Sequence, residues 1–446
     1  MTLRFGTDGV RGVANVDLTP ELVVALGRAA VRVLGKDRPF LVARDTRRSG
    51  PMLEAALVAG LCAEGADVDV AGVLPTPGAA YLSQSRDCPA AMISASHNPF
   101  PDNGIKFFTR GGRKLPDAVQ ERIEAELDSL VAFAGPGASG SGVGTSRPAP
   151  DVVEAYVAHL VAALEGRRLE GLLVVVDCGH GAAVEAAPEA LARLGAKVEV
   201  RNVEPDGTNI NAGCGSTHPG ALQREVVRLN AAAGLAFDGD ADRLIAVDDQ
   251  GALVDGDHLL AIAALDLRSR GRLAHDTVVT TVMANLGFRH AMVEHGVRVV
   301  ETSVGDRYVL EAMEAEGAVL GGEQSGHLVF ADLATTGDGL LSGLVLLDVM
   351  ARSGRPLSEL AGVVTKLPQV LCNVRVADRT GLDAARPFWD EVAAVEAEMA
   401  GGGRVLVRPS GTEPFVRIMV EAATAEAAEA YTDRLAESLL GTLGAG

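Results

Sequence analysis

Three aspartates at alternate positions form the clearest chemical pattern in the sequence. Asp238, Asp240 and Asp242 lie in a short loop between two apolar runs, 235–237 and 244–247, that indicate strands. Carboxylates this close repel one another, and a hard divalent cation such as Mg²⁺ relieves the repulsion. A solvated acidic turn is the alternative. The apolar flanks favour a magnesium site, which in turn implies a phosphate nearby, because Mg²⁺ commonly completes its shell with phosphate or water.

A second loop could supply a nucleophile. Residues 94–99 read Ser-Ala-Ser-His-Asn-Pro and follow the apolar run 90–93. Loops at strand ends are where α/β proteins place chemistry. Ser96 is a candidate nucleophile, although the adjacent His97 need not point at it, and Lys106 is a second candidate for proton transfer. Taken alone, an ordinary turn of Ser, Asn and Pro explains this loop more simply.

Two further loops combine glycine with polar side chains. Residues 321–327 (GGEQSGH) offer the donors and acceptors that bind sugar hydroxyls. Residues 408–414 (RPSGTEP) join two apolar runs of a hairpin, where arginines could grip phosphate oxygens and hydroxyls could add donors. Polar turns without a ligand are the alternative for both. The candidate residues are Glu323, Ser325 and His327 in the first loop, and Arg408, Ser410, Gly411, Thr412 and Arg417 in and after the second.

A strand–loop–helix–strand pattern recurs three times and positions these loops. The copies begin at the apolar runs 40–43, 172–176 and 278–282, and each spans roughly thirty residues, as a βαβ unit does. Three copies predict three related α/β domains with mixed sheets, and the hairpin and helix at the end predict a small C-terminal α+β domain. A single doubly wound sheet is less favoured, because the Gly/Ser-rich stretch 134–150 indicates a flexible connection between the first two copies. The predicted domains are 1–150, 151–253, 254–366 and 367–446.

Composition excludes several classes of protein. Lys and Arg total 40 against 59 Asp and Glu, and the formal net charge of -19 argues against nucleic acid or an anionic membrane as a partner. Five scattered cysteines without a CxxC pair indicate a reducing compartment and no structural zinc. No uncharged apolar run approaches about 18 residues, and the first residues lack the apolar core of a signal peptide. We therefore expect a cytoplasmic protein.

Together, the four loops resemble those of the α-D-phosphohexomutase superfamily. The order SASHNP, DGDADR, GEQSGH, RPSGTEP along the chain is specific, although each motif alone is not. Segments 5–12 (FGTDGVRG) and 209–219 (NINAGCGSTHP) are most similar to the bacterial branch that acts on glucosamine phosphates, and the resemblance extends to about residue 417. Two segments depart from that branch, at Gly179-His180 and at Ala284, and both lie outside the four loops.

The resemblance implies a role for each candidate residue. Ser96 would carry a phosphoryl group and give one oxygen to Mg²⁺, while Arg243 would lie beside the phosphoserine. Arg11 and Lys106 would serve in proton transfer and charge stabilisation. The implied catalytic residues are Ser96, Lys106, Arg11 and His97; the metal ligands are Ser96, Asp238, Asp240 and Asp242; and the substrate-binding residues are Arg243, Glu323, Ser325, His327, Arg408, Ser410, Gly411, Thr412 and Arg417.

The resemblance also implies a reaction. Glucosamine 6-phosphate would be converted to glucosamine 1-phosphate through a 1,6-bisphosphate, feeding UDP-N-acetylglucosamine and cell-wall synthesis. The cofactors would be Mg²⁺ and an activating glucosamine or glucose 1,6-bisphosphate. Alternatives are a phosphomannomutase or phosphoglucomutase with the same machinery, a magnesium-dependent phosphatase, and a non-catalytic sugar-phosphate sensor. The general acid and base, and the choice between a monomer and a homodimer, stay open.

Overall fold

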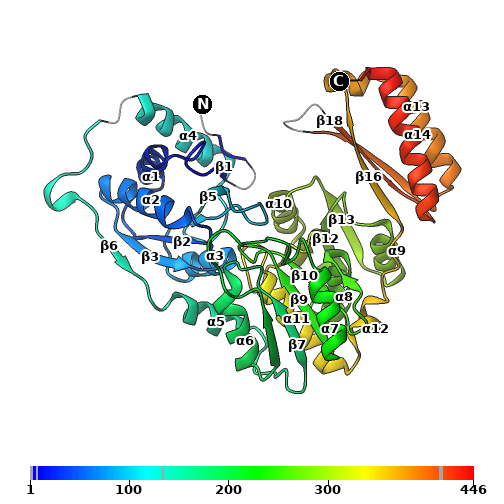
Figure 1. Ribbon diagram of the computed structural model, residues 1–446, viewed down its shortest axis with the longest axis horizontal. Helices are drawn as coiled ribbons and strands as arrows, with labels where there is room; N and C mark the ends of the chain where they lie inside the picture. The colour runs from blue at the N-terminus through cyan, green and yellow to red at the C-terminus, as the bar shows by residue number, and fades with distance from the viewer. Residues whose placement is uncertain (1–3, 7–8, 133–134, 411–414, 446) are drawn as a thin grey trace. The chain divides into compact units, whose positions relative to one another are not determined.

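The structure is a computed structural model that describes residues 4–6, 9–132, 135–410 and 415–445 (Figure 1). The chain divides into two compact units. Unit 1 comprises Met1–Met283 and Val297–Val363, and unit 2 comprises Ala284–Gly296 and Val364–Gly446. Within the described ranges, no helix combines the length and the apolar character needed to cross a bilayer.

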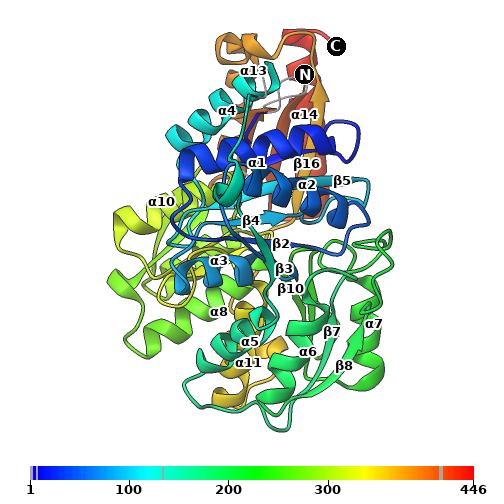
Figure 2. The same ribbon diagram turned by 90° about the vertical axis from the view of Figure 1, so that its left-hand side faces the viewer.

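The first sheet of unit 1 contains the first predicted strand–helix–strand copy. Its strand order is β1-β5-β4-β2-β3-β6, and β2 and β3 pair in parallel as that copy requires. Helices α1, α2 and α4 share one apolar core with this sheet, and α1 and α2 lie side by side in Figure 2. Thr19 caps α1, because its side chain accepts a hydrogen bond from the Leu22 N–H. The bounds are β1 Val10–Val13, α1 Pro20–Leu34, β2 Phe40–Arg44, α2 Gly50–Ala63, β3 Val68–Val73, α3 Thr76–Ser85, β4 Ala90–Ile93, β5 Asp102–Phe108, α4 Asp117–Ala132 and β6 Ser146–Pro148.

The second sheet has the order β11-β10-β9-β7-β8 and is mixed. Strands β7 and β8 are parallel, whereas β9 and β10 form an antiparallel hairpin whose turn is the acidic loop. The predicted strands on both sides of that loop are therefore confirmed. The bounds are α5 Val152–Ala162, β7 Leu173–Asp177, α6 Ala183–Arg193, β8 Lys197–Arg201, α7 Gly220–Leu229, β9 Ala233–Phe237, β10 Leu244–Val247 and β11 Leu253–Val254.

The third sheet has the order β13-β12-β14-β15. Strands β12 and β13 are parallel, and the antiparallel pair β14 and β15 carries the predicted sugar loop at its turn. Asp338 caps helix α11, because its side chain accepts a hydrogen bond from the Leu341 N–H. The bounds are α8 Gly256–Ser269, β12 Thr277–Thr281, β13 Arg298–Thr302, α10 Asp306–Glu316, β14 Leu320–Gly322, β15 Leu328–Phe330, α11 Gly339–Ser353 and α12 Leu357–Ala361.

Unit 2 is built on an antiparallel sheet of order β16-β18-β17, covered by helices α13 and α14. The predicted hairpin and the predicted helix after it are both present, and Thr424 caps that helix. Helix α9 also belongs to this unit, because the side chain of Asn285 bonds the backbone of Leu367 and the Leu286 N–H bonds Glu421. The bounds are α9 Leu286–Glu294, β16 Gln369–Arg375, α13 Arg386–Met399, β17 Arg404–Pro409, β18 Phe415–Glu421 and α14 Ala425–Leu443.

The expectation of a flexible connection over 134–150 is wrong for the residues that the structure describes there. Strand β6 extends the first sheet in parallel beside β3. The Gly144 N–H donates to the carbonyl of Cys62 at 3.0 Å, and a Cβ on Gly144 would lie 2.0 Å from the carbonyl oxygen of Ala66. Glycine at this position permits close backbone packing, which composition alone does not distinguish from flexibility.

This close approach predicts a position-specific loss of stability. Gly144→Ala would force a methyl group against the Ala66 carbonyl and should lower the free energy of unfolding by about 1–3 kcal/mol, as overpacking does. Gly142→Ala is the matched control, since the nearest atom to its added Cβ would be 3.9 Å away. Thermal unfolding followed by circular dichroism would measure both. Equal midpoints for the two variants would contradict the observed packing.

Candidate active site

The serine loop and the acidic loop come from different sheets and meet at the hydroxyl of Ser96. The serine loop leaves the carboxyl end of β4, and the acidic loop is the turn between β9 and β10. Ser96 Oγ donates a hydrogen bond to Asp238 Oδ2 at 2.6 Å, and both residues are buried. The structure therefore places the predicted nucleophile directly against the predicted metal ligands.

The three aspartates leave room for a cation. One carboxylate oxygen from each lies within 4.8 Å of the others. Asp240 Oδ2 accepts from Lys106 Nζ at 2.8 Å and from Thr76 Oγ1 at 2.5 Å. The Oδ1 atoms of Asp240 and Asp242 are buried and accept no hydrogen bond from any described residue. Because buried acceptors rarely go without a partner, a divalent cation fits this arrangement of oxygens.

The pKa values of Asp238 and Asp240 shift in opposite directions. Burial, together with repulsion from Asp242 and Asp240, raises the pKa of Asp238 well above its ordinary value. Burial also acts on Asp240, but the charge and hydrogen bond of Lys106 outweigh it and hold the pKa of Asp240 below its ordinary value. Lys106 thus stabilises the charge of Asp240, whereas burial and the two neighbouring carboxylates disfavour charge on Asp238. A bound divalent cation would offset that penalty.

Basic residues surround the serine. Lys106 lies on β5, and Arg11 lies on the neighbouring strand β1. The Arg243 N–H donates to Asp238 at 3.2 Å, and its guanidinium Nε lies 3.9 Å from Asp242 Oδ1. His97 Nδ1 is 3.2 Å from Ser96 Oγ, and burial together with the charges of Arg243 and Arg11 lowers the pKa of His97. This positive surrounding suits a phosphoryl group on Ser96.

The sugar loop adjoins the acidic loop. Gly326 has φ +91°, and the carbonyl of Gly326 accepts from the Leu244 N–H at 3.0 Å, directly after Arg243. A Cβ on Gly326 would lie 1.9 Å from the Leu244 carbonyl oxygen, so only glycine permits this contact. The structure therefore brings the second and third predicted loops together.

The three predicted residues of the sugar loop differ in accessibility. The Glu323 carboxylate accepts from the Gly305 N–H at 3.2 Å, and Ser325 is exposed. His327 is buried, with its Nε2 3.6 Å from Asp306 Oδ2. Only Glu323 and Ser325 are therefore accessible enough to meet a ligand in this arrangement.

The fourth predicted loop lies in unit 2 and is described within that unit. Arg408 on β17 faces Arg417 on β18 as a cross-strand pair. Burial and the charge of Arg417 lower the pKa of Arg408. Ser410 is buried, and its N–H donates to the Phe415 carbonyl at 2.8 Å. Like charges directly opposite each other are destabilising by themselves and favour a bound anion. Gly411 and Thr412 lie outside the described residues.

Sequence reasoning missed four residues that shape the site: Asp45, Arg47, Thr76 and Asn211. Asp45 and Arg47 follow β2, which pairs in parallel with β4, so both loops emerge at the same sheet edge. The strand-end rule that singled out Ser96 could have found them. Thr76 begins α3 and carries no comparable signal. Asn211 lies in the segment 209–219, which the resemblance marks without giving it a role.

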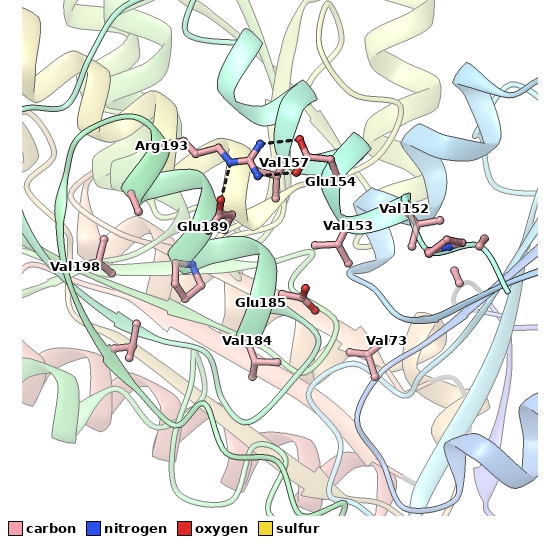
Figure 3. Close-up of a pocket in the computed structure, with 16 residues that line it drawn as sticks. Val73, Val152, Val153, Glu154, Val157, Val184, Glu185, Glu189, Arg193 and Val198 are labelled. Atoms are coloured by element: carbon pink, nitrogen blue, oxygen red, sulfur yellow. Dashed lines mark hydrogen bonds and ion pairs between the residues drawn. The ribbon is translucent and has the colours of Figure 1, made fainter.

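A large hollow in the described structure lies away from these loops (Figure 3). Its volume is about 830 Å³, and aliphatic side chains from β3, α5, α6 and β8 line most of it. Its arginine, Arg193, is held by Glu154 at 2.5 Å and Glu189 at 2.7 Å, so its charge is already neutralised. The hollow contains none of the predicted site residues and lacks the chemistry for an anionic substrate.

Comparison with known proteins identifies the family. Phosphoglucosamine mutase of Symbiobacterium thermophilum is 55% identical over 446 residues, which cover 98% of each chain. The phosphoglucosamine mutase of Frankia alni is 55% identical over 448 residues, again with 98% of each chain covered. Models of the phosphoglucomutase/phosphomannomutase alpha/beta/alpha domains I, II and III match residues 2–132, 154–251 and 255–367, and the model of the C-terminal domain matches residues 371–438. The chain belongs to this family.

Solved structures agree with the phosphoglucomutase/phosphomannomutase fold. A family protein from Burkholderia thailandensis superposes with a TM-score of 0.81 at 27% identity, covering 100% of this chain and 98% of that one. The N-acetylphosphoglucosamine mutase of Aspergillus fumigatus, in complex with GlcNAc-6P and magnesium, gives 0.69 at 19% identity, covering 99% and 96%. The predicted superfamily and the predicted fold class are thus confirmed.

The two carboxylate oxygens that accept no hydrogen bond from the described residues predict a measurable cation site. Asp242→Asn should weaken binding of Mn²⁺, used as a spectroscopic substitute for Mg²⁺, by about tenfold or more, because a ligand charge is lost. Electron paramagnetic resonance of free Mn²⁺ would measure the affinity. Asp206→Asn is the control, since Asp206 is an exposed carboxylate in another loop that accepts backbone N–H groups, which an amide oxygen can also do. Unchanged affinity in Asp242→Asn would remove the triplet as the cation site.

Proposed function

We propose that this family member interconverts glucosamine 6-phosphate and glucosamine 1-phosphate through a phosphorylated Ser96. Sequence identity supports the glucosamine assignment, because phosphoglucosamine mutases are 52–55% identical to the chain over nearly its whole length. One observation carries the chemistry: Ser96 Oγ lies 2.6 Å from Asp238, inside the acidic triplet. The phosphomannomutase, phosphoglucomutase, phosphatase and sensor readings remain the alternatives for the experiment to exclude.

The proposed reaction has two balanced transfers. First, the bond between phosphorus and Ser96 Oγ breaks, a bond to the 1-hydroxyl of glucosamine 6-phosphate forms, and the hydroxyl proton passes to the imidazole of His97, while the cationic side chains of Lys106 and Arg11 stabilise charge on the transferring group. The product is the 1,6-bisphosphate. After the sugar reorients, Ser96 Oγ takes the 6-phosphoryl group, the 6-oxygen regains a proton, and glucosamine 1-phosphate leaves. Phosphoryl-transfer catalysis comes mostly from positioning and charge neutralisation, which the site offers.

A divalent cation would be held by Asp238, Asp240 and Asp242 with one oxygen of the phosphorylated Ser96. All of these ligands are hard oxygens, which favours Mg²⁺. Bound there, Mg²⁺ would neutralise charge on the transferring phosphoryl group. Lys106 contributes in the same sense, because its ammonium reaches Asp240 at 2.8 Å and Asp242 at 3.9 Å.

Two other loops would hold the rest of the substrate. Glu323 and Ser325 would form hydrogen bonds with sugar hydroxyls, and the buried His327 would lie close to them. Arg408, Ser410 and Arg417, with Gly411 and Thr412, would bind the phosphate that is not reacting. A glucosamine or glucose 1,6-bisphosphate would rephosphorylate Ser96 whenever the intermediate escapes.

A phosphate adduct and a product assay test this proposal together. Purified protein treated with glucose 1,6-bisphosphate and Mg²⁺ should show a phosphate adduct by intact mass, and Ser96→Ala should lose both the adduct and at least about 10³-fold of turnover. Glucosamine 6-phosphate should outcompete glucose and mannose 6-phosphates in kcat/KM. Full turnover by Ser96→Ala would end the phosphoserine mechanism.

The same assay separates the alternatives. Release of inorganic phosphate in place of an isomer would identify a phosphatase. Preference for mannose or glucose phosphate would identify the sister activities. Binding of sugar phosphate without any turnover would identify a sensor.

A further inference from the structure

A fully buried arginine organises the backbone of the serine loop. Arg47 has no exposed side-chain surface, and its Nε pairs with Asp45 at 2.9 Å. Its two terminal nitrogens donate to four carbonyl groups of one loop. These are Ser96 at 2.7 Å, Asn98 at 2.8 Å, Pro99 at 2.6 Å and Asp102 at 3.0 Å. Asp45 and the four carbonyls together use all five N–H donors of the guanidinium, so no donor is left to bind a substrate.

The same network reaches Ser96 from its other side. Asp45 Oδ2 accepts from Ser94 Oγ at 2.7 Å, and Ser94 Oγ accepts from the Ser96 N–H at 2.9 Å. Both backbone polar groups of Ser96 are therefore tied to the Asp45–Arg47 pair. The pair thus constrains the φ and ψ angles of the serine without using its Oγ, which bonds Asp238 instead.

The second α/β sheet adds an independent contact. Asn211 Nδ2 donates to the Ser96 carbonyl at 2.9 Å and to that of Asn98 at 3.3 Å. Gly239 in the acidic loop makes the approach possible, since a Cβ there would lie 2.5 Å from the Ser96 carbonyl oxygen and 2.9 Å from Asn211 Nδ2. Segment 209–219 was similar to the family without an implied role, and its Asn211 here bonds the backbone of the serine.

Ser96 needs such a grip because its backbone is strained. Its φ is +54°, in the left-handed region that non-glycine residues rarely adopt. Strained backbone of this kind persists only where the surroundings hold it, and it is concentrated at functional sites. A relaxed backbone at Ser96 would turn the side chain away from its present direction toward Asp238.

We propose that Arg47 and Asn211 are positioning residues that clamp the Ser96 carbonyl, hold the serine in its left-handed conformation and so aim Oγ at the acidic triplet. The inference rests on the proposed role of Ser96 as the phosphoryl carrier. Arg47 comes from the first sheet and Asn211 from the second, as does Asp238. The orientation of the Ser96 side chain therefore depends on the association of the first and second sheets, which also brings Asp238 to the serine.

The test removes one arm of the clamp. In Asn211→Ala, the saturating single-turnover rate of transfer from phosphorylated Ser96 to glucosamine 6-phosphate should fall about 10–100-fold, since small misplacements of reacting groups cost this much. The half-saturating concentration of glucosamine 6-phosphate should stay within about twofold, because Asn211 contacts the loop and not the proposed sugar groups. Quenched samples analysed by intact mass would follow the loss of the phosphate adduct.

A matched variant controls for general loosening of the loop. Asn209→Ala removes a side chain of the same type two positions away, which bonds the Glu204 carbonyl and the Asp206 N–H and does not touch the serine loop. Its single-turnover rate should stay within about twofold of wild type. An equal loss of rate in both variants, or no loss in Asn211→Ala, would overturn the clamp.

Hydrogen exchange gives a readout separate from activity. Amides of segment 94–102 should exchange faster in Asn211→Ala than in wild type, while those of the core strand β7 should be unchanged. Arg47→Lys, which retains the charge beside Asp45 but has too few donors for four carbonyls, should show the same pattern more strongly. Unchanged exchange at 94–102 in both variants would refute the inference. A wild-type protein that forms no Ser96 adduct would instead refute the proposed function.

Discussion

Mutual repulsion among three carboxylates in one buried hairpin turn is the constraint that the rest of unit 1 accommodates. Asp238, Asp240 and Asp242 offer oxygens within 4.8 Å of one another in a setting that burial makes unfavourable for charge. Two of these oxygens have no donor among the described residues. Such a turn holds its shape only when its neighbours supply compensation, and those neighbours come from all three sheets.

Each sheet contributes a different kind of compensation. The first provides charge and hydrogen bonds, through Lys106 and Thr76 on Asp240. The second provides the hairpin itself. The third provides backbone support: the Gly339 N–H at the start of α11 donates to the Ala241 carbonyl at 3.1 Å, and Gly326 bonds Leu244. Because all three sheets stabilise the acidic turn, formation of the site depends on the association of the three sheets.

The sequence predicted the elements that obey simple periodicity. Short apolar runs such as 172–176 are strands to within a residue or so, and the segments with Ser96 and the three aspartates are loops that follow strands, as predicted. Sequence reasoning failed where a glycine-rich composition is compatible with either a flexible or a closely packed backbone. Around Gly144 the composition indicated flexibility, whereas the structure uses the absent side chain for contact. The assignment of α9 to unit 2 was also beyond reach, because it depends on bonds from Asn285 to Leu367, more than eighty positions away.

Buried polar residues mark a further limit of sequence reasoning. Arg47 reads as an ordinary surface arginine in Asp-Thr-Arg, and nothing local reveals that four carbonyls surround it. Burial of Arg47 is tolerated because Asp45 neutralises its charge and every donor makes a hydrogen bond. Both conditions arise only when the loops are folded together. Removing either partner would leave a buried charge, so Asp45 and Arg47 must be retained together. The conformation of the serine loop therefore depends on buried residues of the first sheet as well as on the sequence of the loop itself.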